Sequence, residues 1–164
     1  MYNNVLSVPM LAETADRKVV YTFHSYEPMI FTHQAHTGYR ICRQISALPT
    51  KCLAEYREAS KILSQELAGA IYADDLKEMG ADFFETLFAP ALKIAQERDI
   101  PLYCGEYGVI DLADNDSKIR WAADICSVFN KYGIGRAYWN YKGKDYGIVD
   151  IPDAAVQKQL AQKL

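Results

Sequence analysis

The chain reads Ile-Pro-Leu-Tyr-Cys-Gly-Glu over residues 100–106, a short apolar run that comes directly after a stretch with helical periodicity. Proline is tolerated at the first position of a strand, so this run predicts a short buried strand. Residues 134–139 follow another helical stretch and predict a second strand. Residues 18–23 are rich in β-branched and aromatic side chains, which predicts a strand buried on both faces.

The segments between these runs have the pattern of amphipathic helices. Residues 114–117 offer helix caps, and apolar residues then recur at helical spacing until Gly133. A similar stripe over residues 84–95 is interrupted by Pro90, which predicts a kink or the start of a second segment. Residues 152–164 predict a short closing helix. This alternation indicates right-handed βαβ units, a parallel sheet and the α/β fold class.

One long insertion follows the first predicted strand. From residue 27 to residue 72 the chain holds aromatic residues, two histidines and one predicted helix over residues 53–68. Loops of about forty residues in a compact domain usually carry function. The length of 164 residues predicts one domain, residues 1–164.

Composition and charge exclude several partners. The net charge is -3, and the basic residues are scattered among acidic ones, so we expect no nucleic-acid partner. No apolar run is long enough for a membrane span, and we expect no membrane partner. The first residues have neither a basic n-region nor an apolar h-region, which predicts no signal peptide in this chain.

The cysteines and histidines predict neither a metal site nor a cofactor. No CxxC pair is present, and the histidines show no zinc-type spacing near the cysteines. Buried free thiols are favoured over disulfides. The four cysteines are Cys42, Cys52, Cys104 and Cys126, and the three histidines are His24, His33 and His36.

Alternate residues of a strand share a face, which predicts where polar side chains gather. Each predicted strand has one file that ends in a large polar or aromatic residue at its carboxyl end, where parallel βα folds bind ligands. We therefore expect His24, Tyr26, Glu106 and Trp139 to converge on one pocket. The files are Val20, Thr22, His24 and Tyr26; Leu102, Cys104 and Glu106; and Gly135, Ala137 and Trp139.

Each of these residues also has a structural interpretation. A carboxylate at the end of an apolar strand is costly unless it is paired, so a site role for Glu106 is favoured over a turn cap. His24 could equally be a core histidine, and Trp139 alone would more often be core packing. Lys142 and Asp145 are more typical of solvated loop charges.

Several motifs follow one another in a specific order. They are His24-Ser25-Tyr26 after a strand, Glu27-Pro28, Phe31-Thr32-His33-Gln34, Cys104-Gly105-Glu106-Tyr107-Gly108-Val109, Ala137-Tyr138-Trp139-Asn140-Tyr141-Lys142, and Tyr146-Gly147. This ordered set resembles the carboxyl-terminal part of family 5 glycoside hydrolases, the cellulase family. The resemblance covers nearly the whole chain.

The resemblance implies a partial TIM-type (β/α) barrel whose strands here are the sixth to eighth, with residues 2–4 at the end of the fifth. It implies a retaining glycosidase that hydrolyses β-1,4-glycosidic bonds of a glucan or related polysaccharide. Glu106 matches the nucleophile, and His24 and Tyr26 match the pair beside it. Trp139 matches the aromatic platform under the sugar, and Lys142 is similar to a contact with a neighbouring sugar. The resemblance also suggests a secreted or periplasmic location, although the chain itself leaves the location open.

The chain departs from the family pattern at the second carboxylate. The family's acid/base glutamate lies in an Asn-Glu pair, and this sequence has no such dipeptide. Barrels of this kind take roughly 250 residues, so we expect residues 1–164 to be one incomplete barrel domain. Glu27 or Asp145 could in principle replace the missing acid, but no positional argument supports either.

Three explanations follow: a truncated fragment, which is favoured; a half completed by an amino-terminal half-barrel on another chain; or a relic that folds as a small open sheet. The isolated chain is expected to be inactive. The alternative functions are a non-catalytic carbohydrate-binding half-barrel and an interaction module. The kind of polysaccharide is left open.

Overall fold

The computed structural model describes residues 3–16, 18–34 and 78–164. The predicted helix at residues 53–68, together with Cys42, Cys52 and His36, lies outside these ranges. The elements in chain order are η1 (Val5–Met10), β1 (Tyr21–Ser25), α1 (Met29–Thr32), α4 (Ala81–Arg98), β2 (Leu102–Tyr107), α5 (Asn115–Tyr132), β3 (Gly135–Tyr138), η4 (Ile148–Asp150) and α6 (Ala154–Ala161).

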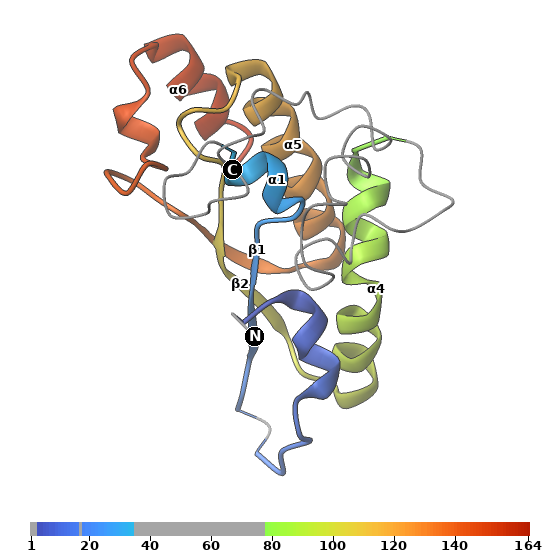
Figure 1. The fold of residues 1–164 in the computed structure, drawn as a ribbon. Helices are drawn as coiled ribbons and strands as arrows, with labels where there is room; N and C mark the ends of the chain where they lie inside the picture. The colour runs from blue at the N-terminus through green and yellow to red at the C-terminus, as the bar shows by residue number, and fades with distance from the viewer. Residues whose placement is uncertain (1–2, 17, 35–77) are drawn as a thin grey trace.

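The three strands form one parallel sheet in the order β1-β2-β3, which confirms the predicted α/β class (Figure 1). The first paired residues of β1 and β2 are Tyr21 and Leu102. Both strands therefore begin later than the predicted starts at residues 18 and 100, because a residue belongs to a strand only where it pairs with a neighbouring strand. Asn4 adds an isolated parallel bridge to His24, so the start of the chain lies beside β1.

The residues at the ends of α5 account for where this helix begins and ends, whereas α4 differs from the prediction in its interior. Asp114 caps α5 by accepting a hydrogen bond from the Ser117 backbone N–H at 2.8 Å, and Gly133 ends it in the left-handed conformation, as predicted. In contrast, α4 runs without interruption from Ala81 to Arg98 with Pro90 inside it. Of the two outcomes expected at Pro90, a kink or a second segment, the second segment is absent, because a proline removes one backbone hydrogen bond while the apolar face on both sides still packs.

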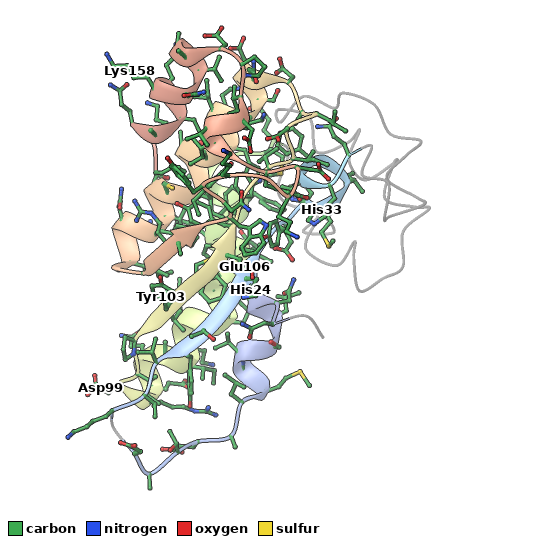
Figure 2. All side chains as sticks on the ribbon, turned by 90° about the vertical axis from the view of Figure 1, so that its left-hand side faces the viewer. His24, His33, Asp99, Tyr103, Glu106 and Lys158 are labelled. Atoms are coloured by element: carbon green, nitrogen blue, oxygen red, sulfur yellow. The ribbon has the colours of Figure 1, made fainter. Side chains whose placement is uncertain are left out.

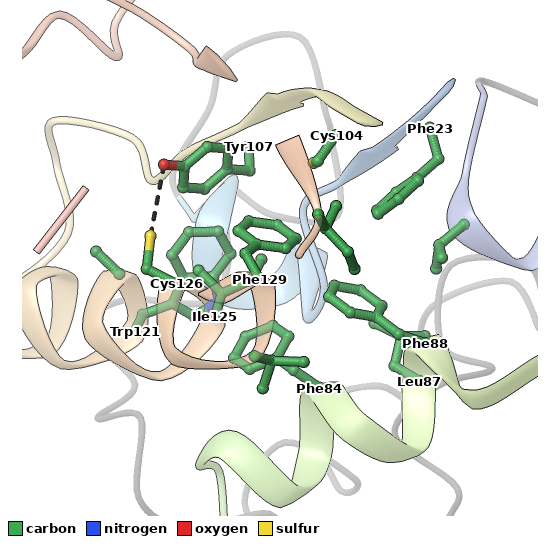
Figure 3. Packing of buried hydrophobic residues seen from close by; sticks show 14 of the residues in the cluster. Phe23, Phe84, Leu87, Phe88, Cys104, Tyr107, Trp121, Ile125, Cys126 and Phe129 are labelled. Atoms are coloured by element: carbon green, nitrogen blue, oxygen red, sulfur yellow. Dashed lines mark hydrogen bonds between the residues drawn. The ribbon is translucent and has the colours of Figure 1, made fainter. Parts of the chain in front are cut away.

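The core lies between the sheet and the two long helices (Figure 3). Phe23, Cys104 and Tyr107 point from the strands into this layer, and each is at most 1% exposed. The rings of Phe88 on α4 and Phe129 on α5 stack at 5.6 Å. The thiols of Cys104 and Cys126 are buried and free, which confirms the prediction for these two cysteines.

The opposite face of the sheet is open in the described part of the chain. Val20 is 50% exposed, Tyr103 is 37% exposed, and Thr22 is also exposed. The prediction that the first strand is buried on both faces is therefore wrong here. Among the described residues, helices cover one face of the sheet only, so β1 alternates between buried and accessible side chains.

Candidate active site

A β-bulge decides which face carries Glu106. Phe23 pairs with Cys104, but the next residue, His24, pairs with Glu106, so Gly105 is an extra residue in β2. Cys104 is buried under the helices, whereas Glu106 lies on the open side with His24. The predicted file that joined Leu102, Cys104 and Glu106 on one face is therefore wrong, because the bulge reverses the alternation.

Glu106 is held by two side chains from β1 and the residues just after it. The Tyr26 hydroxyl donates a hydrogen bond to Glu106 Oε2 at 3.0 Å, and His24 Nδ1 lies 3.4 Å from the same oxygen. The side chains of His24 and Glu106 are each 30% exposed. Figure 2 shows the two next to one another on the sheet, with Tyr103 further toward the amino ends of the strands. Three of the predicted site residues thus meet, as expected.

Tyr26 is a permanent donor in this arrangement. Burial of the phenol raises the pKa of Tyr26 well above its usual range, and the negative charge of the neighbouring Glu106 carboxylate adds to this effect. The hydroxyl therefore stays protonated at every ordinary pH and can stabilise a negative charge on Glu106.

Trp139 lies directly after β3, where its backbone contacts the end of β2. Its N–H donates to the Tyr107 carbonyl at 2.8 Å, and its own carbonyl oxygen lies against Gly108, where a side chain would clash. The indole is 37% exposed. The Trp139 backbone thus contacts Tyr107, the residue that follows Glu106, and the partly exposed indole is accessible to a ligand.

Lys142 and Asp145 are exposed in the loop after β3. The Asp145 carbonyl accepts a hydrogen bond from the Asp111 N–H at 2.7 Å, which ties this loop to the loop after β2. Nothing in the geometry joins Lys142 to Glu106, and its sugar contact stays a prediction.

Glu27 faces the interior. Its carboxylate accepts hydrogen bonds from the Asn4 amide, the Ser25 hydroxyl at 3.2 Å and the Tyr26 N–H at 3.0 Å. Burial raises the pKa of Glu27, and these hydrogen bonds offset only part of that effect. A general acid must reach the leaving group of the substrate, so this buried position does not favour Glu27 as a replacement acid.

Neither a cluster of metal-ligating side chains nor a membrane-spanning helix is present in the described part of the chain. No group of three or more histidine, cysteine or acidic side chains within them could hold a metal ion. None of the helices in the described ranges has the length and apolar character needed to cross a bilayer.

Two rings that pack on Tyr26 had no role predicted from sequence. His33 lies 5.0 Å and Tyr146 6.1 Å from the Tyr26 ring, both edge-on. His33 and Tyr146 both belong to quoted motifs, but periodicity gives no signal for a contact between segments so far apart in the chain.

Comparison with known sequences identifies relatives along the whole chain. The sequence model of the cellulase family, glycosyl hydrolase family 5, matches residues 2–145. Endoglucanase C of Acetivibrio thermocellus is 31% identical over 166 residues, covering 99% of this chain and 48% of that protein. Cellodextrinase A of Ruminococcus flavefaciens is 35% identical over 136 residues, covering 82% of this chain and 33% of that protein. The chain spans about half the length of the first of these relatives.

Solved structures show the same fold. The cellulose synthase subunit Z of Clostridioides difficile aligns with a TM-score of 0.68 at 19% identity, over 96% of this chain and 45% of that one. The endoglucanase Cel5A of Thermotoga maritima aligns with a TM-score of 0.67 at 18% identity, over 98% of this chain and 44% of that one. The three-stranded sheet and its helices are therefore part of a (β/α) barrel, and the chain belongs to the cellulase family, glycosyl hydrolase family 5.

Proposed function

We propose that this chain carries the nucleophile half of a retaining glycosidase that hydrolyses β-1,4-glycosidic bonds in a glucan or related polysaccharide. The observation that carries the proposal is the contact of Tyr26 and His24 with one oxygen of Glu106. A retaining enzyme needs a carboxylate that attacks the anomeric carbon and forms a glycosyl-enzyme intermediate. Both contacts use Oε2, so Oε1 is the oxygen that attacks.

Tyr26 and His24 keep the Glu106 carboxylate in one orientation. The Tyr26 phenol supplies a hydrogen bond that stabilises the carboxylate before attack. Once the glycosyl bond forms, Glu106 loses its charge and this hydrogen bond weakens, which favours release of the intermediate to water.

Trp139 is proposed as the platform for the sugar at the cleavage point, and Lys142 as a contact to a neighbouring sugar. An indole face stacks on the apolar face of a pyranose, and the Trp139 indole is accessible beside the Glu106 end of β2. Lys142, exposed in the same loop, can donate to sugar hydroxyls.

The second carboxylate of a retaining pair lies about 5 Å from the nucleophile. We propose that it comes from a complementing amino-terminal half-barrel, on the same polypeptide or on another. The open face of the sheet supports this, because this face would line the inside of a complete barrel and the other strands would cover it. Without that half, the chain is expected to be inactive on natural polysaccharides.

A 2,4-dinitrophenyl 2-deoxy-2-fluoro-cellobioside tests the nucleophile directly. Its leaving group departs without protonation, so the label reports attack by Glu106 even where the acid is absent. Intact mass and peptide mapping should show one label on the peptide that holds Glu106. Glu106→Gln should take up none, and the matched control Glu85→Gln, which changes a carboxylate of α4 that is as accessible as Glu106 and is paired with Lys131, should be labelled normally. A folded chain that is labelled elsewhere, or not at all, contradicts the proposal.

A non-catalytic carbohydrate-binding role is the second candidate, and the accessible Trp139 indole favours it. Calorimetry with cellohexaose separates the two functions. Binding that is lost in Trp139→Ala, in a chain that the fluorosugar does not label, would support binding without turnover.

A further inference from the structure

The loops that follow all three strands meet at one buried residue, Thr32. Its backbone carbonyl accepts a hydrogen bond from the Ile110 N–H in the loop after β2, at 3.0 Å, and another from the Tyr146 hydroxyl in the loop after β3, also at 3.0 Å. Thr32 itself ends α1, where the last carbonyls of a helix have no partner within it and can accept from elsewhere. One peptide group therefore joins the three loops around the candidate site.

The side chain of Thr32 reaches back to the residue that holds Glu106. Its hydroxyl donates to the Tyr26 carbonyl, and Oγ1 lies 2.9 Å from His33 Nδ1. A carbonyl can only accept, so the single hydroxyl proton is used on Tyr26. His33 must then donate its Nδ1 proton to Oγ1, which assigns the ring tautomer.

These contacts enclose the Tyr26 ring. His33 and Tyr146 both pack edge-on against it, and their own rings lie 5.6 Å apart. Thr32 holds both of these rings, one through its hydroxyl and one through its carbonyl, and it also holds the Tyr26 backbone. The position of the Tyr26 phenol, 3.0 Å from Glu106 Oε2, is thus set from three sides.

We propose that Thr32 is a positioning residue for the nucleophile, acting on Glu106 through Tyr26. The expected effect on the rate of labelling rests on the proposed function. The contacts of Thr32 on which the inference is built do not depend on that function. Thr32 touches neither Glu106 nor a substrate in this role. It keeps the Tyr26 hydroxyl directed at the Glu106 carboxylate. The loops after β2 and β3 supply the two donors that hold the Thr32 carbonyl.

A double-mutant cycle tests the route through Tyr26. Thr32→Val keeps the shape of the side chain but removes the hydroxyl, and Thr32→Ser is the matched control that keeps it. With the dinitrophenyl fluorocellobioside, Thr32→Val should lower the limiting rate constant of labelling about tenfold, the loss typical of one hydrogen bond, and leave the half-saturation concentration nearly unchanged. In a Tyr26→Phe background, Thr32→Val should cause little further loss, because the two residues act as one unit.

Equal losses in both backgrounds, or a loss in Thr32→Ser as large as in Thr32→Val, would overturn the proposal and indicate a general structural role. If Thr32→Val does not fold, Tyr146→Phe removes the phenol donor to the same carbonyl and should show the same dependence on Tyr26. Tyr107→Phe is its control, because the Tyr107 hydroxyl lies in the core, 3.5 Å from Cys126 Sγ.

A ring measurement keeps this inference separate from the proposed function. In the chain with ¹³C-labelled tyrosines, the Tyr26 ring resonances should move in Thr32→Val and in Tyr146→Phe, and stay in place in Thr32→Ser. That result supports the positioning role even if the fluorosugar labels nothing and the glycosidase proposal fails. Tyr26 resonances that do not move in Thr32→Val overturn it, whatever the labelling shows.

Discussion

Gly108 is the residue at which the loop after β3 crosses the end of β2. A Cβ built on Gly108 would run into the Trp139 carbonyl oxygen, and that contact is to backbone, which cannot swing aside. The close approach is what allows the Trp139 N–H to reach the Tyr107 carbonyl. A missing side chain at one residue thus lets the Trp139 backbone lie against the end of β2.

Gly108→Ala should lower the free energy of unfolding by about 1–3 kcal/mol, because the methyl group forces the two backbone segments apart. It should also weaken cellohexaose binding by displacing Trp139. Urea unfolding and calorimetry measure the two effects. Gly80→Ala is the control, because a Cβ at Gly80 meets nothing within 4 Å. Equal stability of both variants would contradict the close approach at Gly108.

Glu27 makes the stability of the chain depend on pH. Because burial raises the pKa of Glu27 in the folded state, the unfolded chain releases this proton first as the pH rises. The contribution of Glu27 to stability is therefore complete below the ordinary carboxyl value of 4.5 and is lost as the pH rises through the folded-state value.

Relative to Glu27→Gln, which cannot ionise, the native chain should lose stability above pH 4.5 by up to about 1.4 kcal/mol per pH unit, until the buried carboxyl ionises. Urea unfolding from pH 4 to pH 8 measures the two slopes. Glu97→Gln, on the exposed surface of α4, is the control and should run parallel to the native chain. A Glu27→Gln curve that also runs parallel to the native one would show that burial does not shift this group.

At the scale of elements, α4 tolerates a proline because its packing is distributed along one face. Phe84, Leu87 and Phe88 before Pro90 and Ala91 after it are all buried, and Pro90 itself is exposed. The helix thus keeps its contacts with α5 and the sheet on both sides of the missing hydrogen bond. Pro90 therefore does not divide the helix into two segments, because the core holds both halves.

Pro90→Ala should raise the free energy of unfolding by about 2 kcal/mol, because it restores the backbone donor without disturbing the buried face. Thermal and urea unfolding measure the change. Pro101→Ala is the control: this proline precedes β2, so no helical hydrogen bond is gained there. A lower stability of Pro90→Ala would show that the packing of α4 requires the bend that proline imposes.

At the scale of the whole molecule, the described chain has one covered and one open face of its sheet. Val20 and Tyr103 expose apolar surface on the open side, while the helices bury the other side. Contiguous apolar surface on a sheet tends to be covered by another segment or another molecule.

The isolated chain should therefore self-associate as its concentration rises. The double variant Val20→Lys/Tyr103→Lys should weaken that association by about tenfold or more, because it removes two apolar contacts and places charges opposite each other. Sedimentation velocity across a concentration series measures it. Leu112→Lys is the control, since Leu112 is 66% exposed in the loop after β2 and not on the sheet. A native chain that stays monomeric throughout would contradict the expectation.

The sequence by itself determined the features that depend on neighbouring residues. Apolar runs predicted the three parallel strands, the caps at Asp114 and Gly133 predicted the ends of α5, and the ends of the strands predicted the meeting of His24, Tyr26 and Glu106. These features follow from local propensity and from the rule that ligands gather at the carboxyl ends of parallel strands, so a single chain is sufficient to reveal them.

Only the tertiary structure decided the face of β2 that carries Glu106, the exposure of one side of the sheet, and the junction of three loops at Thr32. The bulge at Gly105 is a matter of register between two strands far apart in the chain, and the junction joins residues separated by more than seventy positions. Local pattern has no information on such pairings, because they are selected by the packing of the whole fold.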